Sequence, residues 1–171
     1  MQSKRSIHIG LAVSTGLTIA ALAAQGGAVA APENPEAGIE AVRAWTAKYQ
    51  DESVAIADGF VRTDDCVPNM GYHYVNFDRF DGRLEPSRPE ALIYEDGPNG
   101  SRVLVAAEWL VVDADQDLAT DDDKPALFGH EFDGPMPGHF PGMPIHYDLH
   151  AYAWHANPDG SFATFNPDVT C

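Results

Sequence analysis

Residues 90–113 read EALIYEDGPNGSRVLVAAEWLVVD and predict an antiparallel hairpin at the centre of the fold. The two flanking runs, 90–95 and 102–113, are rich in β-branched and large apolar residues, as strands are. Between them Pro98-Asn99-Gly100 is typical of a tight turn, so the two strands are expected to pair side by side. Further strands are expected at 71–77, 145–154 and 161–165.

A helix is expected before the first strand, over about residues 36–57. Asn34 can cap it, and Pro35 suits its first position. Asp58-Gly59 marks its end. Apolar residues recur at helical spacing and predict one buried stripe, made of Ile39, Val42, Trp45, Tyr49 and Ile56. The expected fold class is therefore α+β, with an N-terminal amphipathic helix packed on a mainly antiparallel sheet.

A long segment rich in Pro and Gly, residues 125–144, lies between the hairpin and the strand expected at 145–154. Loops of this length are commonly either functional or disordered. Because the segment carries apolar residues such as Phe128 and Phe132, we expect it to be ordered and packed on the sheet. Residues 113–124 open like a calcium-binding loop, but Leu118 and Lys124 stand where that motif needs Gly and Glu. That segment is therefore expected to be a solvated acidic loop.

Residues 1–31 have the three parts of a Sec-type signal peptide: a basic start, an apolar centre and an Ala28-Val29-Ala30 cleavage site. Cleavage would leave a single secreted or extracytoplasmic α+β domain, residues 32–171. The chain has two cysteines, Cys66 and Cys171, and an oxidising compartment favours one disulfide bond between them.

The charge of the chain excludes some classes of partner. All 26 acidic residues and 8 of the 10 Lys and Arg residues follow residue 31, which gives the mature chain a formal charge of −18. A field of this sign repels nucleic acids and anionic membrane surfaces and attracts cations. The expected partners are a metal ion and, for an enzyme or a binding module, a small molecule.

Residues 138–155, GHFPGMPIHYDLHAYAWH, contain four of the seven histidines in the chain. On a helix His146 and His150 would be neighbours, whereas on a strand they would lie about 13 Å apart on one face. The aromatic residues among small ones favour the strand. Tyr147 stands where an HExxH protease needs its glutamate, which excludes that motif. His155 precedes a turn and is expected to be exposed, and His130 is left unassigned.

We hypothesise that these histidines and a carboxylate form a metal site. Glu108 interrupts an apolar strand, and a buried carboxylate needs a cation, a His or solvent beside it. In this hypothesis Glu108 converges with three histidines, while Asp148 orients an imidazole. The histidines are His73, His146 and His150, with His139 on the loop as a cover or an extra ligand. Nitrogen-rich ligation with one carboxylate suits Zn²⁺, Cu²⁺, Mn²⁺ or non-haem iron. The alternative for each residue alone is a hydrogen-bonded core or surface role.

The segments CVPNMGYHYVNF (66–77) and GMPIHYDLH (142–150) resemble those of a group of small secreted bacterial proteins of uncharacterised activity. The resemblance spans most of the mature chain and implies one exported domain. It implies no catalytic roles. Three functions stay open: a metal-binding protein, a metal-dependent extracellular enzyme, and a binding module with an apolar cleft between helix and sheet.

Overall fold

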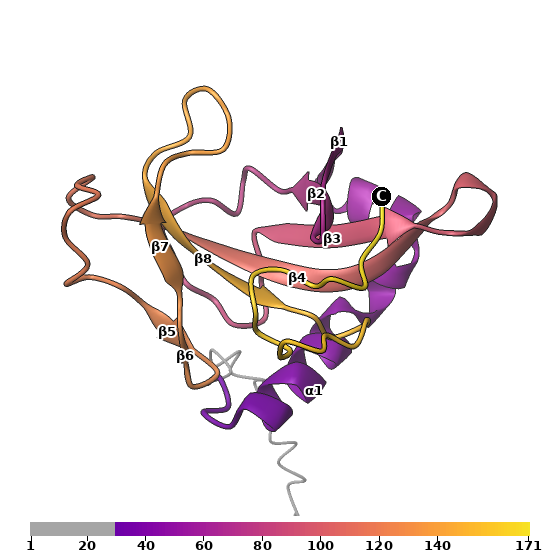
Figure 1. Ribbon diagram of the computed structural model, residues 1–171, viewed down its shortest axis with the longest axis horizontal. Helices are drawn as coiled ribbons and strands as arrows, with labels where there is room; N and C mark the ends of the chain where they lie inside the picture. The colour runs from indigo at the N-terminus through magenta and orange to yellow at the C-terminus, as the bar shows by residue number, and fades with distance from the viewer. Residues whose placement is uncertain (1–29) are drawn as a thin grey trace, which may run out of the picture.

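A computed structural model describes residues 30–171, so the predicted signal peptide lies outside the described residues except for its last two. The chain forms a helical layer packed against one six-stranded antiparallel sheet, in the order β1-β2-β3-β4-β8-β7 (Figure 1). The α+β fold predicted from the sequence is confirmed. The helical elements are α1 (Pro35–Thr46), η1 (Ala47–Gln50), α2 (Glu52–Ala57) and η2 (Pro98–Gly100). The strands are β1 (Val61–Val67), β2 (Gly71–Val75), β3 (Ala91–Asp96), β4 (Arg102–Val112), β5 (Ala126–Leu127), β6 (His130–Glu131), β7 (Asp133–Met136) and β8 (His146–Ala151).

The helix expected over 36–57 is divided into three shorter pieces. Its start is as predicted, because the Asn34 side chain accepts hydrogen bonds from the backbone N–H groups of the first turn. Asp51 then takes an extended conformation and caps α2 by accepting a hydrogen bond from the N–H of Ser53. An Asp side chain that competes for backbone donors in this way favours a new helix start over a continuous helix. The break places Ile56 in solvent, where it is 50 % exposed, so its predicted place in the buried stripe is wrong.

The hairpin of β3 and β4 is present with the predicted antiparallel pairing, and residues 146–151 form a strand rather than a helix. The strand expected at 161–165 is absent, because those residues form turns. Both edges of β8 are already paired, one with β4 and the other with β7, so that segment cannot pair with β8. Strand β1 was missed because its sequence, VRTDDCV, is polar and mostly exposed at the sheet edge.

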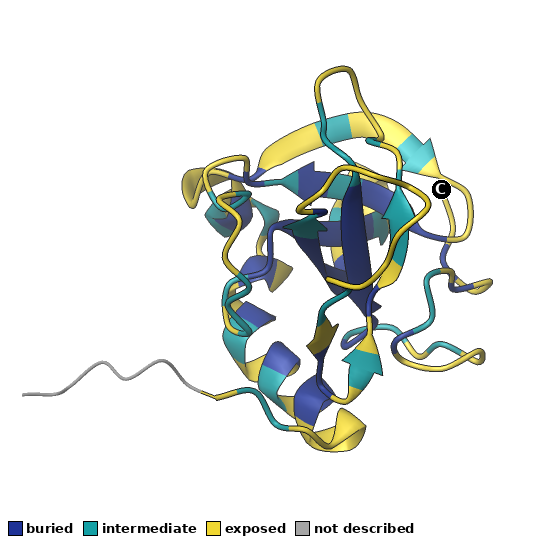
Figure 2. Cartoon of the chain, turned by 90° about the vertical axis from the view of Figure 1, so that its left-hand side faces the viewer, coloured by how far each residue is buried: buried dark blue, intermediate teal, exposed yellow. Residues whose placement is uncertain are grey.

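The two faces of the sheet have different contents. One face packs against α1 and η1 and carries the main core, which includes Tyr94, Trp109 and Leu149. Because side chains alternate along a strand, the residues between these project from the opposite face. There a smaller apolar cluster forms around Ile93 and Tyr152, beside several buried polar side chains. Figure 2 shows the buried strands enclosed by exposed connecting segments.

The C-terminal segment 152–171 helps to cover this second face. Backbone hydrogen bonds join Trp154 to Val105 of β4, and Asn166 to Asn69. The predicted disulfide is present between Cys66 of β1 and Cys171, and it fixes the end of this segment to the sheet edge. Within residues 30–171, none of the helices has both the length and the apolar composition needed to cross a membrane.

The segment rich in Pro and Gly is ordered, as expected, and it contributes to the core. It forms the short strands β5, β6 and β7, and Phe128 lies buried between the rings of Trp45 and Trp109. Of the acidic loop that precedes it, Asp113 is the buried member at 1 % exposure, while residues 114–123 are exposed. Asp123 in that loop accepts hydrogen bonds from Ala114 N–H and the Tyr147 hydroxyl.

Candidate metal-binding site

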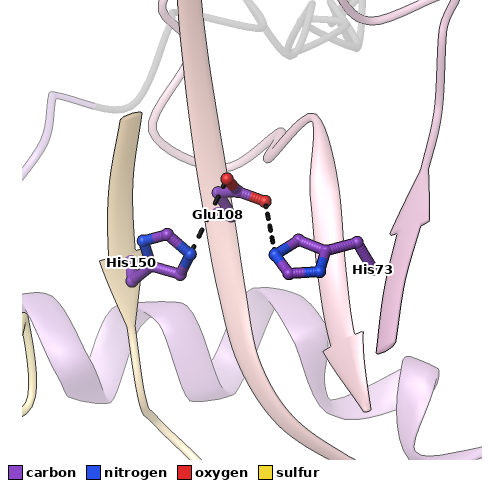
Figure 3. A group of neighbouring side chains, drawn as sticks. All are labelled: His73, Glu108 and His150. Atoms are coloured by element: carbon purple, nitrogen blue, oxygen red, sulfur yellow. Dashed lines mark ion pairs between the residues drawn. The ribbon is translucent and has the colours of Figure 1, made fainter. Parts of the chain in front are cut away.

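Three strands bring His73, Glu108 and His150 together on the sheet face opposite the helices. His150 on β8 lies directly opposite Glu108 on β4, and Ala91 on β3 lies opposite Glu108 on the other side. His73 projects from β2, the strand beyond β3 (Figure 3). The side chains of His73 and Glu108 approach each other across β3, which lies between their strands. We call these three residues the inner group.

The inner group has a geometry that suits a shared ion better than hydrogen bonds. The Nε2 atom of His73 lies 3.7 Å from Oε2 of Glu108, and the Nε2 atom of His150 lies 3.7 Å from Oε1 (Figure 3). Both distances exceed the usual hydrogen-bond range. Two ligands that sit about 2.1 Å from one ion at the tetrahedral angle are about 3.4 Å apart. The three ligand atoms lie within 4.8 Å of one another and could hold a metal ion.

A second set of side chains, which we call the outer group, lies next to the inner group on the same face of the sheet. It consists of His139, His146 and Asp148, whose ligand atoms also lie within 4.8 Å of one another. His146 and Asp148 project from β8, and His139 comes from the connection between β7 and β8. The rings of His139 and His146 meet edge to face with centroids 4.8 Å apart. The two groups adjoin, because Nδ1 of His150 lies 3.9 Å from Oδ1 of Asp148.

Several atoms of the two groups are buried without a hydrogen-bond partner. They are Nδ1 and Nε2 of His150, Nε2 of His146 and Oδ1 of Asp148. Each such atom costs about 1–3 kcal/mol unless another group satisfies it. A metal ion bound in each group would satisfy these nitrogen and oxygen atoms.

Burial shifts the pKa of each inner residue in the direction that favours the neutral form of its side chain. Loss of solvent, followed by the nearby imidazoles, lowers the pKa of His150 to about 3. Loss of solvent and then His139 lower the pKa of His73 to about 4. The imidazoles are therefore neutral at pH 7, which is the form that binds metals. Burial first, then the charges of Asp148 and Glu90, raise the pKa of Glu108 well above its usual range.

The pKa values of the outer group are shifted in the same directions. Burial lowers the pKa of His146 and of His139. Burial first, and Asp133 on β7 second, raise the pKa of Asp148 to about 7. A divalent cation would favour the ionised form of each carboxyl group, because it offsets both the lost solvation and the repulsion between acids.

The structure brings together all six residues of the predicted site, but as two groups rather than one. His146 was predicted to converge with His73, Glu108 and His150, and instead it lies with His139 and Asp148. The period of a β-strand explains the division, because residues four apart on one strand are about 13 Å apart. Asp148, predicted only to orient an imidazole, is itself a possible ligand of the outer group.

Three further polar residues, Glu90, His155 and His130, lie outside both groups. Glu90, which no sequence pattern singled out, is 1 % exposed and accepts a hydrogen bond from Leu110 N–H. Glu90 is the first residue of the strand expected at 90–95, so no alternation of apolar and polar residues before it indicates that it is buried. His155 is half-buried rather than exposed, because its Nδ1 lies 3.0 Å from Oε1 of Glu95. His130 stacks on Phe162 and belongs to neither group.

Comparisons of the chain with protein-family models, with curated proteins and with solved structures found no match. The side chains themselves therefore carry the functional interpretation. Two surface clefts in residues 30–171 lie away from both groups. One, of about 640 Å³, lies between α1 and residues 159–163, and the other, of about 460 Å³, lies beside residues 31–33.

Proposed function

We propose that this protein binds a divalent transition-metal ion through the inner group, His73, Glu108 and His150. The observation that carries the proposal is the placement of two imidazole Nε2 atoms, each 3.7 Å from a different oxygen of one buried carboxylate. The groups that approach are those a transition metal prefers, two neutral nitrogens and one oxygen. They come from three strands of one sheet, which holds them in place before any ion arrives.

A purely structural role for these residues is less consistent with the geometry. A buried Glu that stabilises a His in a core does so through a hydrogen bond of about 2.7–3.2 Å. Neither imidazole makes such a bond to Glu108, and both ring nitrogens of His150 are unpaired. Among residues 30–171 no Lys or Arg forms an ion pair with Glu108 either. A metal ion would satisfy the carboxylate and both imidazoles together.

Metal binding is the function that the site supports best, in preference to a metal-dependent enzyme. Three protein ligands would leave coordination positions open, as in catalytic sites. An enzyme also needs a substrate cleft beside the ion. Neither described cleft is lined by any of the three inner residues. The disulfide between Cys66 and Cys171 supports a role outside the cytoplasm, as the signal sequence predicts.

The proposal is tested by metal analysis of protein secreted from the full chain and purified without an affinity tag. The protein is then titrated separately with Zn²⁺, Cu²⁺, Mn²⁺ and Fe²⁺. We expect at least one tightly held equivalent of one of these ions. Glu108→Gln keeps the shape of the side chain and is expected to weaken binding by about 100-fold or more, since even outer-shell changes cost 10–100-fold. His155→Asn, at a His paired with Glu95, is the matched control and should bind as the wild type does.

Two results would contradict the proposal. One is a protein that retains less than about a tenth of an equivalent of any of these ions after reconstitution, because a preorganised site should hold its ion. The other is an unchanged affinity in Glu108→Gln.

A further inference from the structure

We propose that the outer group, His139, His146 and Asp148, binds a second divalent transition-metal ion, so that the protein holds two ions in a row on one face of its sheet. This inference rests on the proposed function of the inner group, because it extends the same metal-binding role.

The spacing on β8 is the first argument for two ions. The strand presents His146, Asp148 and His150 on one face, at every second residue. The two histidines are about 13 Å apart along the strand. Ligands of one ion each lie only about 2.0–2.2 Å from it, so these two imidazoles cannot share an ion. Each imidazole instead lies in its own set of three ligands.

The orientation of His146 is the second argument. Its Nδ1 lies 3.2 Å from the carbonyl oxygen of Pro144, which accepts a hydrogen bond when Nδ1 carries the proton. That tautomer leaves the lone pair of Nε2 free, and Nε2 is buried without a partner. An imidazole whose distal nitrogen donates to a backbone carbonyl is the usual arrangement of a metal-bound His.

Asp148 supplies the third argument. The residue is 2 % exposed, and its Oδ1 has no hydrogen-bond donor. Asp133 lies directly opposite it on β7, so two carboxyl groups face the same region. A buried carboxylate beside a second acid is costly unless a proton or a cation lies with it. A divalent ion between Asp148 and the two imidazoles would meet that need.

The positions of the two groups also predict the order in which their ions exchange. His150 is 1 % exposed, whereas His139 is exposed and lies on the connection between β7 and β8. A ligand from a surface connection can leave the ion without opening the sheet. The outer ion should therefore be removed by a chelator before the inner one.

The experiment counts Zn²⁺ ions bound to the secreted protein by native mass spectrometry and by titration. The wild type should bind two. His139→Ala, and separately His146→Ala, should each lose one ion and keep the other. Glu108→Gln should lose the other ion and keep the outer one. His139→Ala alters an exposed residue, so it should fold even if His146→Ala does not, and circular dichroism confirms folding of each variant.

The possible results separate the two proposals. One ion in the wild type that is lost in Glu108→Gln but kept in both outer variants overturns this inference and leaves the proposed function intact. One ion that either set of changes removes also overturns it, because all six residues would then serve one site. If no Zn²⁺ is bound, the count is repeated with Cu²⁺, Mn²⁺ and Fe²⁺, and the absence of all four ions overturns both proposals. Two ions that the outer variants still retain would place the second ion elsewhere and overturn the assignment to His139, His146 and Asp148.

Discussion

Glu108 and His150 lie directly opposite each other on β4 and β8, with Oε1 of the acid 3.7 Å from Nε2 of the imidazole. Both residues are at most 2 % exposed. Burial lowers the pKa of His150 and raises that of Glu108, so without a cation the stable state of the pair is neutral. The pair therefore contributes little as an ion pair, and its ionised carboxylate is favoured when a cation is bound.

The first prediction concerns the stability of Glu108→Gln. Because burial raises the pKa of Glu108 and so favours its neutral form in the metal-free protein, the isosteric amide should change the free energy of unfolding by less than about 1 kcal/mol. Zn²⁺ at 100 times the Kd of the inner site should stabilise the wild type by about 2.7 kcal/mol through that site, and this contribution should raise the Tm by roughly 10 °C. Glu108→Gln should gain much less stability from Zn²⁺ at the inner site. Thermal unfolding with EDTA and with Zn²⁺ measures both effects. A variant that unfolds far more readily in EDTA would show that the charge of Glu108 is needed for folding.

The second prediction concerns the disulfide. The bond joins residues 105 positions apart, and closing a loop of that length stabilises a fold by about 4–5 kcal/mol in the chain-entropy model. Cys66→Ser with Cys171→Ser should therefore lower the free energy of unfolding by a few kcal/mol. The amides of residues 152–171 should exchange hydrogen faster, because Tyr152 and Val169 of this segment belong to the same apolar cluster as Ile93. Urea unfolding and hydrogen exchange provide the measurements.

A reducing agent provides the control for the second prediction. It should destabilise the wild type to a similar extent and leave the double variant unchanged. An equal midpoint of unfolding for the wild type and the variant in non-reducing buffer would contradict the role given to the bond.

The strands that hold the site could be predicted because their own sequences carry the signal. Leu104 to Val112 is apolar at nearly every position, and Asn99-Gly100 marks the turn before it. Alternation alone places His146, Asp148 and His150 on one face of β8. Glu108 stood out as a carboxylate in an apolar run, and the structure shows that it is buried. These are local properties of the chain.

The pairing of distant segments could not be predicted in the same way. The sequence does not state that β7 pairs with the edge of β8 that β4 leaves open, and that pairing is what brings His139 beside His146. The burial of Glu90 is also a tertiary effect, because it depends on contact with the backbone of Leu110 on another strand. The division into two groups follows from the strand period together with these long-range contacts.

The third prediction concerns Gly38 on α1. A β-carbon at this position would lie 2.8 Å from Cβ of Phe128 and 2.9 Å from its Cγ. Ala favours a helix over Gly by about 1 kcal/mol, but Phe128 is 1 % exposed and cannot move aside without disturbing the core. Gly38→Ala should therefore destabilise the protein by about 1–3 kcal/mol. Glu40→Ala on the exposed side of α1 is the control and should change the stability by less than about 0.5 kcal/mol. Higher stability in Gly38→Ala, measured by urea unfolding, would mean that α1 packs less closely on Phe128.

The fourth prediction concerns the dependence of stability on pH. Loss of solvent raises the pKa of Glu90 from 4.5 to about 8. Between these two values the folded protein keeps a proton that the unfolded chain has lost. The stabilisation that this proton provides is therefore fully present below pH 4.5. It is lost as the pH rises to about 8, by roughly 1.4 kcal/mol per pH unit at most.

Buried histidines act in the opposite direction at lower pH. The pKa of His150 falls from 6.5 to about 3, so it opposes folding increasingly as the pH falls through 6.5, and this effect fades over about one pH unit above that value. The wild type and Glu90→Gln share these histidines, so the difference between the two proteins from pH 6.5 to 8 isolates the effect of Glu90. In EDTA the wild type should lose stability across this window. Glu90→Gln should lose less, because Gln keeps an oxygen to accept the hydrogen bond from Leu110 N–H and does not ionise. Urea unfolding at pH 6.5, 7.2 and 8.0, with exposed Glu131→Gln as the control, measures the difference. A Glu90→Gln protein with the same pH profile as the wild type would show that Glu90 is ionised in the fold despite its burial.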